Sequence, residues 1–318
     1  MDLMTLLQLL VSSTLMYSAP LIFTAIAGTF SERGGIINIG LEGIMVMGAF
    51  MGAIANLALG DSFGAATPWL GLLAGGLCGL LYSAIHAVAT VHLRADHTIS
   101  GTVLNIAAPA LGVFLVRAMY GKAQTGPLSH PFISTTIPVL NKIPVIGPIF
   151  FTNTSLPAYL GIVVAIISAV VIYRTTFGLR LRSVGEHPAA AETLGINVYA
   201  MRYAGVLLSG FLGGIGGAIQ AQAIANEFSL LTISGQGFIA MAAMIIGQWH
   251  PLGAMAASLL FGLAQSLGRV GNYIPVISSL PAVFLQILPY VLTVVVLIGF
   301  MGQSRAPKAD GVTYVRNR

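Results

Sequence analysis

Long apolar segments are the feature that most constrains the fold of this chain. They follow one another along almost all of its 318 residues, and only 7% of the residues are charged. A soluble globular chain carries about 25% charged residues, so this one cannot cover a water-exposed surface. About 20 apolar residues are needed for one helix to cross a bilayer core of about 30 Å. Lipid offers no hydrogen-bond partner to backbone N–H and C=O groups, so a segment that crosses it must pair these groups internally, as a helix does. The sequence therefore predicts an all-α polytopic membrane protein with about nine transmembrane helices (8–10).

The apolar segments set the boundaries of the predicted crossings. These are residues 4–27, 36–59, 69–93, 99–117, 156–173, 199–224, 238–249, 251–267 and 283–301. Residues 269–281 are interpreted as a broken or re-entrant piece, and residues 119–154 as a long loop with five prolines. We therefore assign residues 1–303 to a single transmembrane domain and residues 304–318 to a tail.

Basic residues predict the orientation in the membrane. Positive side chains gather in two places, the polar stretch around residues 174–202 and the tail after residue 304. Cytoplasmic loops carry the excess of lysine and arginine, so both places are predicted to be cytoplasmic. Nine crossings then put the N-terminus outside the cell.

The sequence lacks the motifs of an enzyme that would energise transport. No G-x-x-x-x-G-K-[ST] loop is present, because Gly121-Lys122 is followed by alanine, and no H-E-x-x-H motif is present either. The single Cys78 excludes a cysteine-rich metal site. The sequence also has no basic run with interleaved aromatic residues, which is the pattern that would indicate binding to nucleic acid. We expect no catalytic site, no cofactor and no metal, and we expect another chain to supply the energy.

Polar residues within the apolar segments are the candidates for a solute path. Asn38 and Glu42 are four apart and are predicted to share one helix face. They either line a pore or cap backbone groups around the turn Gly34-Gly35. An intramembrane carboxylate is costly unless it faces a cavity or a partner, which makes Glu42 a candidate in both readings.

The remaining polar candidates fall into two groups. One group ends the sixth crossing, where it either lines an entrance or lies in water; the other sits singly in apolar helices, where hydrogen bonds between helices are the expected role. The first group is Gln220, Gln222, Asn226 and Glu227, and the second is Asn105 and Gln286.

Glycines at four-residue spacing predict close helix packing. They form flat grooves into which another helix fits, and we assign them to packing rather than to ligand chemistry. The pairs are Gly210/Gly214 and Gly213/Gly217 in the sixth crossing, and Gly71/Gly75 and Gly75/Gly79 in the third.

The polar stretch 176–197 carries the start and stop signals of a short helix. Pro188 suits the first position of a helix, and Gly195 suits the position just past its end. Residues 185–195 are therefore predicted to form a helix of about two turns, roughly 10 Å long, that docks on a partner; a plain connecting loop is the alternative. The expected docking residues are Gly185, Glu186, Pro188, Ala189, Ala190 and Gly195.

Two segments resemble a known family. Gly178-Leu179-Arg180, Val184-Gly185-Glu186 and Leu194-Gly195-Ile196-Asn197 are similar to the coupling loop of the ABC importer permeases for ribose-type sugars, branched-chain amino acids and nucleosides. Residues 31–43, SERGGIINIGLEG, resemble the N-terminal signature of the branch that works with basic-membrane-protein-type lipoproteins and imports nucleosides.

The resemblance implies a function and a set of partners. It implies a permease subunit in a bacterial inner membrane that translocates nucleosides, paired with a second, paralogous permease. A cytoplasmic ABC ATPase and an extracytoplasmic substrate-binding lipoprotein complete such importers. A permease for monosaccharides or branched-chain amino acids is the alternative within the family, and a self-sufficient secondary transporter is the alternative outside it.

Overall fold

The computed structural model is all-helical over the residues that it describes. These are residues 3–144, 146–271 and 306–315, with single positions at 284, 287, 288, 291, 294, 295 and 298. The helices are α1 (Leu3–Arg33), α2 (Leu41–Phe63), α3 (Thr67–Ala87), α4 (His97–Tyr120), α5 (Ile146–Phe151), α6 (Leu156–Arg174), α7 (Thr176–Glu186), α8 (Pro188–Thr193), α9 (Val198–Ile219), α10 (Gln236–Ile246) and α11 (Pro251–Val270). Short turns of π-helix extend α3 over Val88–His92 and α9 over Gln220–Ala225.

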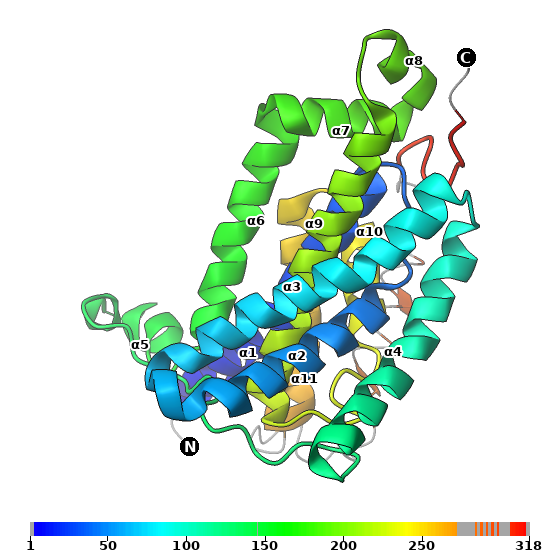
Figure 1. Cartoon of the computed structure of the whole chain (residues 1–318). Coiled ribbons are helices and arrows are strands. Elements are labelled where there is room, and N and C mark those ends of the chain that lie inside the picture. Colours follow the sequence, from blue (N-terminus) through cyan, green and yellow to red (C-terminus); the bar gives the residue numbers. More distant parts are fainter. Residues whose placement is uncertain are drawn as a thin grey trace.

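The long helices run side by side around a central pair. α1 packs against α9, α11, α10 and α6, while α9 also packs against α2 and α3. Figure 1 shows α8 and the C-terminus at one end of the molecule, and the N-terminus and α5 at the other. We call these the α8 end and the N-terminal end. α7 lies across the α8 end, at a steep angle to α6 (Figure 1).

The outward faces of several long helices are apolar. Side chains at four-residue spacing on α3 are each more than half exposed, from Leu73 at 53% to Leu81 at 69%. α4 and α6 expose a similar row of isoleucine, valine and phenylalanine side chains. Six helical segments in the described residues are long and apolar enough to cross a membrane. An apolar exterior over such lengths is the surface expected of helices in lipid.

Glycines bring α2, α3 and α9 into backbone contact. A Cβ atom on Gly214 would lie 2.3 Å from the carbonyl oxygen of Gly75, and one on Gly79 would lie 2.3 Å from that of Gly210. A Cβ atom on Gly217 would lie 1.9 Å from the carbonyl oxygen of Met45, in α2. The two predicted glycine grooves, on α3 and α9, therefore pack against each other. Gly213 is less crowded, since its nearest atom is an Ile44 methyl group at 3.1 Å.

Helices cover each predicted crossing up to residue 267, with two differences. α2 begins at Leu41 rather than at residue 36, because Gly35 takes a left-handed conformation (φ +84°) and residues 36–38 are not helical. α10 has only 11 residues, which is about 16 Å of helix and half of a bilayer core. The predicted crossing 283–301 lies outside the described residues apart from the single positions named above, and the piece 269–281 lies outside them after residue 271.

Candidate functional site

A polar cavity opens at the N-terminal end of the molecule. It has a volume of about 720 Å³, and its lining comes from the loop after α4, the end of α9 and the segment that follows it. Volumes of this size are typical of small-molecule sites. The polar side chains in its lining are Gln124, Gln220, Glu227, Ser229, Thr232 and Arg269.

Gln220 is the lining residue whose polar group is least satisfied. Its side chain is only 8% exposed, and its Oε1 atom is buried without a hydrogen-bond partner among the described residues. A buried amide oxygen without a partner is costly, and this one belongs to a residue that lines the cavity. Glu227 is half-buried in the same wall.

The other two candidates of this group lie elsewhere. Gln222 is fully buried, where it accepts a hydrogen bond from Asn56 Nδ2 (2.8 Å) and donates one to the Pro68 carbonyl oxygen (3.3 Å). It fastens α9 to α2 and α3, so the expectation that it lines an entrance or lies in water differs from its position in the structure. Asn226 is exposed and ends the π-helix in a left-handed conformation (φ +58°).

Glu42 closes the N-terminus of the half-length helix α10. Its two carboxylate oxygens accept hydrogen bonds from the backbone amides of Gly235 (2.6 Å) and Gly237 (2.7 Å). These amides are among the N–H groups that a helix start leaves unpaired, and a negative charge is stabilised there. The carboxylate thus caps a helix 193 residues further along the chain, rather than the turn Gly34-Gly35.

Asn38 does not share a helix face with Glu42. It lies in the turn before α2, where Nδ2 donates to Ser209 Oγ of α9 (3.0 Å) and Oδ1 is buried without a partner among the described residues. The prediction failed because the left-handed Gly35 delays the start of α2.

Asn105 joins α4 to the start of α2. Its Oδ1 atom accepts from the Gly43 amide (2.8 Å) and its Nδ2 atom donates to the Ile39 carbonyl (2.8 Å). This is the hydrogen bonding between helices that a lone amide in an apolar helix suggests. Gln286, the other lone amide, lies outside the described residues.

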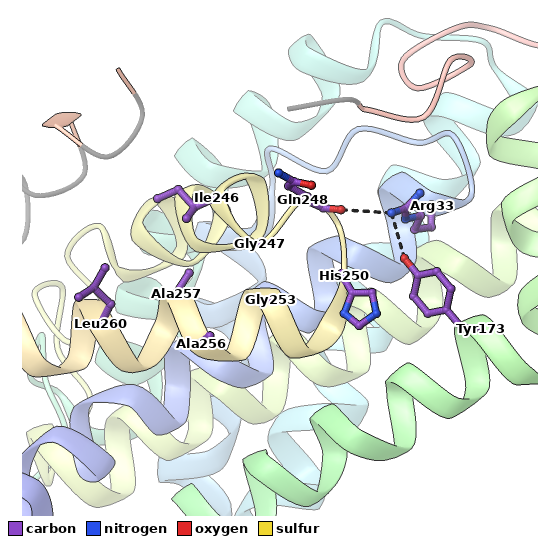
Figure 2. A pocket seen from close by; sticks show the side chains of 10 residues that line it. All are labelled: Arg33, Tyr173, Ile246, Gly247, Gln248, His250, Gly253, Ala256, Ala257 and Leu260. Atoms are coloured by element: carbon purple, nitrogen blue, oxygen red, sulfur yellow. Dashed lines mark hydrogen bonds between the residues drawn. The ribbon is translucent and has the colours of Figure 1, made fainter. Parts of the chain in front are cut away.

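Arg33 holds the turn between α10 and α11 against the end of α1. Its guanidinium donates to the carbonyl oxygens of Trp249 (2.9 Å) and Gln248 (3.1 Å) and to the Tyr173 hydroxyl (3.0 Å). Figure 2 shows the bonds to Gln248 and Tyr173, which lie beside a cavity with a volume of about 680 Å³. Gln248 and Trp249 both have positive φ angles, a strained conformation that these bonds stabilise. His250 stacks on Tyr173, and burial, followed by the charge of Arg33, lowers the pKa of its imidazole.

Two helices, rather than one, form the polar segment at the α8 end. Thr175 caps α7 by accepting from the Gly178 amide, and His187 caps α8 by accepting from the Ala190 amide. Pro188 is in the first turn of α8, and Gly195 follows its end with φ +79°. α7 was missed because its signal is weak locally, a threonine cap followed by apolar residues at positions 177, 181 and 184.

In the pair of helices α7 and α8, the exposed small side chains lie on α8. Ala189 and Ala190 are exposed small residues, and Glu186 is exposed between the two helices. Gly185 lies on the opposite side, because its Cβ atom would be 2.2 Å from the Arg33 carbonyl oxygen. Its expected role as a docking residue is therefore replaced by close contact of α7 with the residues that follow α1.

Comparisons with known proteins find one matching family and several relatives that align over most of the chain. A family model described as "Branched-chain amino acid transport system / permease component" matches residues 10–300. The chain is 59% identical, over the full length of both chains, to the nucleoside ABC transporter permease protein NupC of Lactococcus lactis. It is 51% identical, again over both full lengths, to the guanosine ABC transporter permease protein NupQ of Bacillus subtilis. It is also 23% identical, over 95% of this chain and 83% of the relative, to the nucleoside ABC transporter permease protein NupB of Lactococcus lactis.

Proposed function

Because this chain belongs to the family of branched-chain amino acid transport system permease components, we propose that it is the membrane-spanning subunit of an ATP-driven nucleoside importer. The full-length likeness to NupC carries this proposal, and the likeness to NupQ supports it. Both relatives are described as permeases for nucleosides or for one nucleoside. Both relatives share more than half of their residues with this chain over the whole length of each chain.

A partner ATPase supplies the energy in this proposal. The chain has no nucleotide-binding loop of its own, and α8 presents exposed Ala189 and Ala190 at the end of the molecule with the basic loops. Small side chains let a partner approach closely. The ATPase then docks on α8 from the cytoplasm, the N-terminus lies outside, and an extracytoplasmic lipoprotein delivers the solute at the opposite end.

The second permease of the complex is a longer paralogue. The names of the relatives support this pairing, since Lactococcus lactis has both NupC and NupB, and this chain resembles both. NupB resembles it more distantly and extends beyond the aligned part. The complex is therefore a heterodimer of permeases, with this chain as the NupC-like partner.

The polar cavity at the N-terminal end is the entrance for the solute. Gln220 lines it and carries a buried Oε1 atom that has no partner among the described residues, and a nucleoside that enters offers hydroxyl and amino donors to this acceptor. Gln220→Leu should raise the KM for nucleoside uptake about tenfold, the effect of losing one hydrogen bond in a buried site. Asn226→Gly, at an exposed position six residues further on whose left-handed backbone suits glycine, should leave KM unchanged. An unchanged KM in both variants would refute this entrance.

Uptake of labelled solutes tests the function. Cells lacking the gene should lose ATP-dependent uptake of guanosine and other nucleosides, and the restored gene should recover it. Uptake of leucine and glucose should not change. Loss of leucine or sugar uptake with normal nucleoside uptake would overturn the nucleoside assignment. Nucleoside uptake that persists when the partner ATPase is inactivated would indicate a secondary transporter instead.

A further inference from the structure

The chain returns to the α8 end after its membrane helices and packs there in an ordered, irregular segment, residues 306–315. The last residues of most domains are poorly ordered unless contacts tie them down. Here Pro307, Ala309 and Tyr314 are buried. In Figure 1 this segment lies beside the loops that join α1 to α2 and next to α7 and α8.

Two backbone hydrogen bonds join the segment to its neighbours at its middle. The Ala309 amide donates to the Gly185 carbonyl at the end of α7 (2.8 Å), and the Gly311 amide donates to the Gly35 carbonyl (3.3 Å). Gly35 lies in residues 34–40, the α1–α2 turn. The segment therefore bridges α7 and the α1–α2 turn at the place where Gly185 already contacts Arg33.

Further along, the segment reaches α9 and α8. Arg202 of α9, only 2% exposed, donates from Nη2 to the Val312 carbonyl (3.0 Å). The Tyr314 hydroxyl donates to a carboxylate oxygen of Glu192 in α8. The Tyr314 ring packs edge-on against Tyr199, with 5.9 Å between ring centroids. A hydrogen bond to a charged side chain is stronger than one between neutral groups. The bond between Tyr314 and Glu192 therefore joins α8 firmly to the segment.

Asp310 adds a buried acidic contact to the α1 side. Its carboxyl group contacts that of Glu32, which also accepts a hydrogen bond from the Trp249 indole in the turn after α10. Burial, followed by the Glu32 carboxyl, raises the pKa of Asp310 above its ordinary value of 3.8, and the guanidinium of Arg202 opposes this. Two acidic groups in contact are stable when they share a proton.

From these contacts we infer that residues 306–315 act as a strap that sets the position of α8 relative to the α1–α2 turn, so that ATPase movements reach the membrane helices. This inference rests on the proposed function. Without the strap, the contacts of α8 among the described residues are mainly with α7 and α9, and α7 then links it to the end of α1. The strap adds a second link, which joins α8 and the end of α7 to the α1–α2 turn. The strap is a positioning element and touches no solute.

The test removes one hydroxyl group and leaves the fold. Tyr314→Phe keeps the ring but loses the bond to Glu192, and Glu192→Gln weakens the same bond from the other side. Thr313→Ala, at an exposed neighbouring position, is the matched control. In the full complex with ATPase, second permease and lipoprotein, Tyr314→Phe should lower uptake per ATP hydrolysed about tenfold, the effect of losing one charged hydrogen bond. Assembly and membrane insertion should stay normal.

Two further measurements separate the strap from a general structural role and from the proposed function. The double variant should transport no worse than either single variant, because both remove one bond. Amides of α8 in the permease alone should exchange hydrogen about tenfold faster in Tyr314→Phe than in the control. This measurement needs no solute. If exchange in α8 is faster in Tyr314→Phe but the wild type takes up no nucleoside, the proposed function is refuted and the role of the strap still stands. If both single variants have the same uptake per ATP hydrolysed and the same rate of hydrogen exchange in α8 as the wild type, the inference of a strap is wrong.

Discussion

Glu42→Gln is the substitution that separates a structural carboxylate from one that acts on the solute. In the structure both oxygens of Glu42 accept from backbone amides at the start of α10, at 2.6 and 2.7 Å. Glutamine keeps one acceptor and turns an NH₂ group toward the other amide. One amide then faces a donor, which costs about 1–3 kcal/mol, and the remaining bond loses its charge assistance, for about 2–4 kcal/mol in total.

Thermal unfolding of the purified permease in detergent measures this loss. A change of 2–4 kcal/mol corresponds to a fall of about 5–10 °C in Tm for a protein of this size class. Amides around Gly235 and Gly237 should lose protection from hydrogen exchange before the rest of the chain does. Glu227→Gln is the matched control, because that carboxylate lies in the wall of the polar cavity. Reduced uptake by Glu42→Gln with unchanged Tm and unchanged protection would refute the capping role and assign the charge to the solute path.

Three other predictions concern packing, pH and topology. Gly217→Ala puts a methyl group 1.9 Å from a carbonyl oxygen of α2 and should cost more than about 2 kcal/mol, whereas Gly213→Ala, with a side-chain methyl at 3.1 Å, should cost less; Tm values of both check this. The folded protein holds the Asp310 proton more tightly than the unfolded chain, since its pKa rises from 3.8 to about 9, so stability should fall as pH rises across that range. Asp310→Asn should flatten this dependence of Tm on pH, and an equally steep curve would contradict it. A reporter fused after Asn197 should read cytoplasmic and one inserted near Gly126 external; a cytoplasmic signal at both would contradict the topology.

The sequence predicted the helices and their tight contacts because those depend on local or periodic information. Apolar length fixes where a helix crosses lipid, and glycine spacing fixes which faces are flat. Gly214 against Gly75 is the contact that such spacing predicts. Pro188 and Gly195 likewise bound α8 as their conformational preferences require. The N-cap at His187 is the one local signal there that was overlooked.

The parts that could not be predicted depend on contacts between distant residues. The amide partners of Glu42 lie 193 and 195 positions away, and no pattern near Glu42 marks them. Gln222 has the composition of an exposed helix end, yet Asn56 and Pro68 enclose it. Tyr314 sits in a short polar tail without periodicity, and only the folded protein brings it to Glu192. In each case a polar group was recognisable, and its partner was not.

Residues 32–42 hold the half-length helix α10 at both of its ends. Glu42 caps its start, while Arg33 and Glu32 bind the turn that follows it through Gln248 and Trp249. The same stretch receives α7 at a separation that leaves no room for a single methyl group on Gly185. Close-packed contacts of this kind shift as units instead of absorbing small displacements. A displacement of α7 therefore has to move the end of α1, and with it the turn that anchors α10. Residues 31–43, whose sequence resembles the signature of the nucleoside branch, thus lie at the junction between α7 and the half-length helix α10.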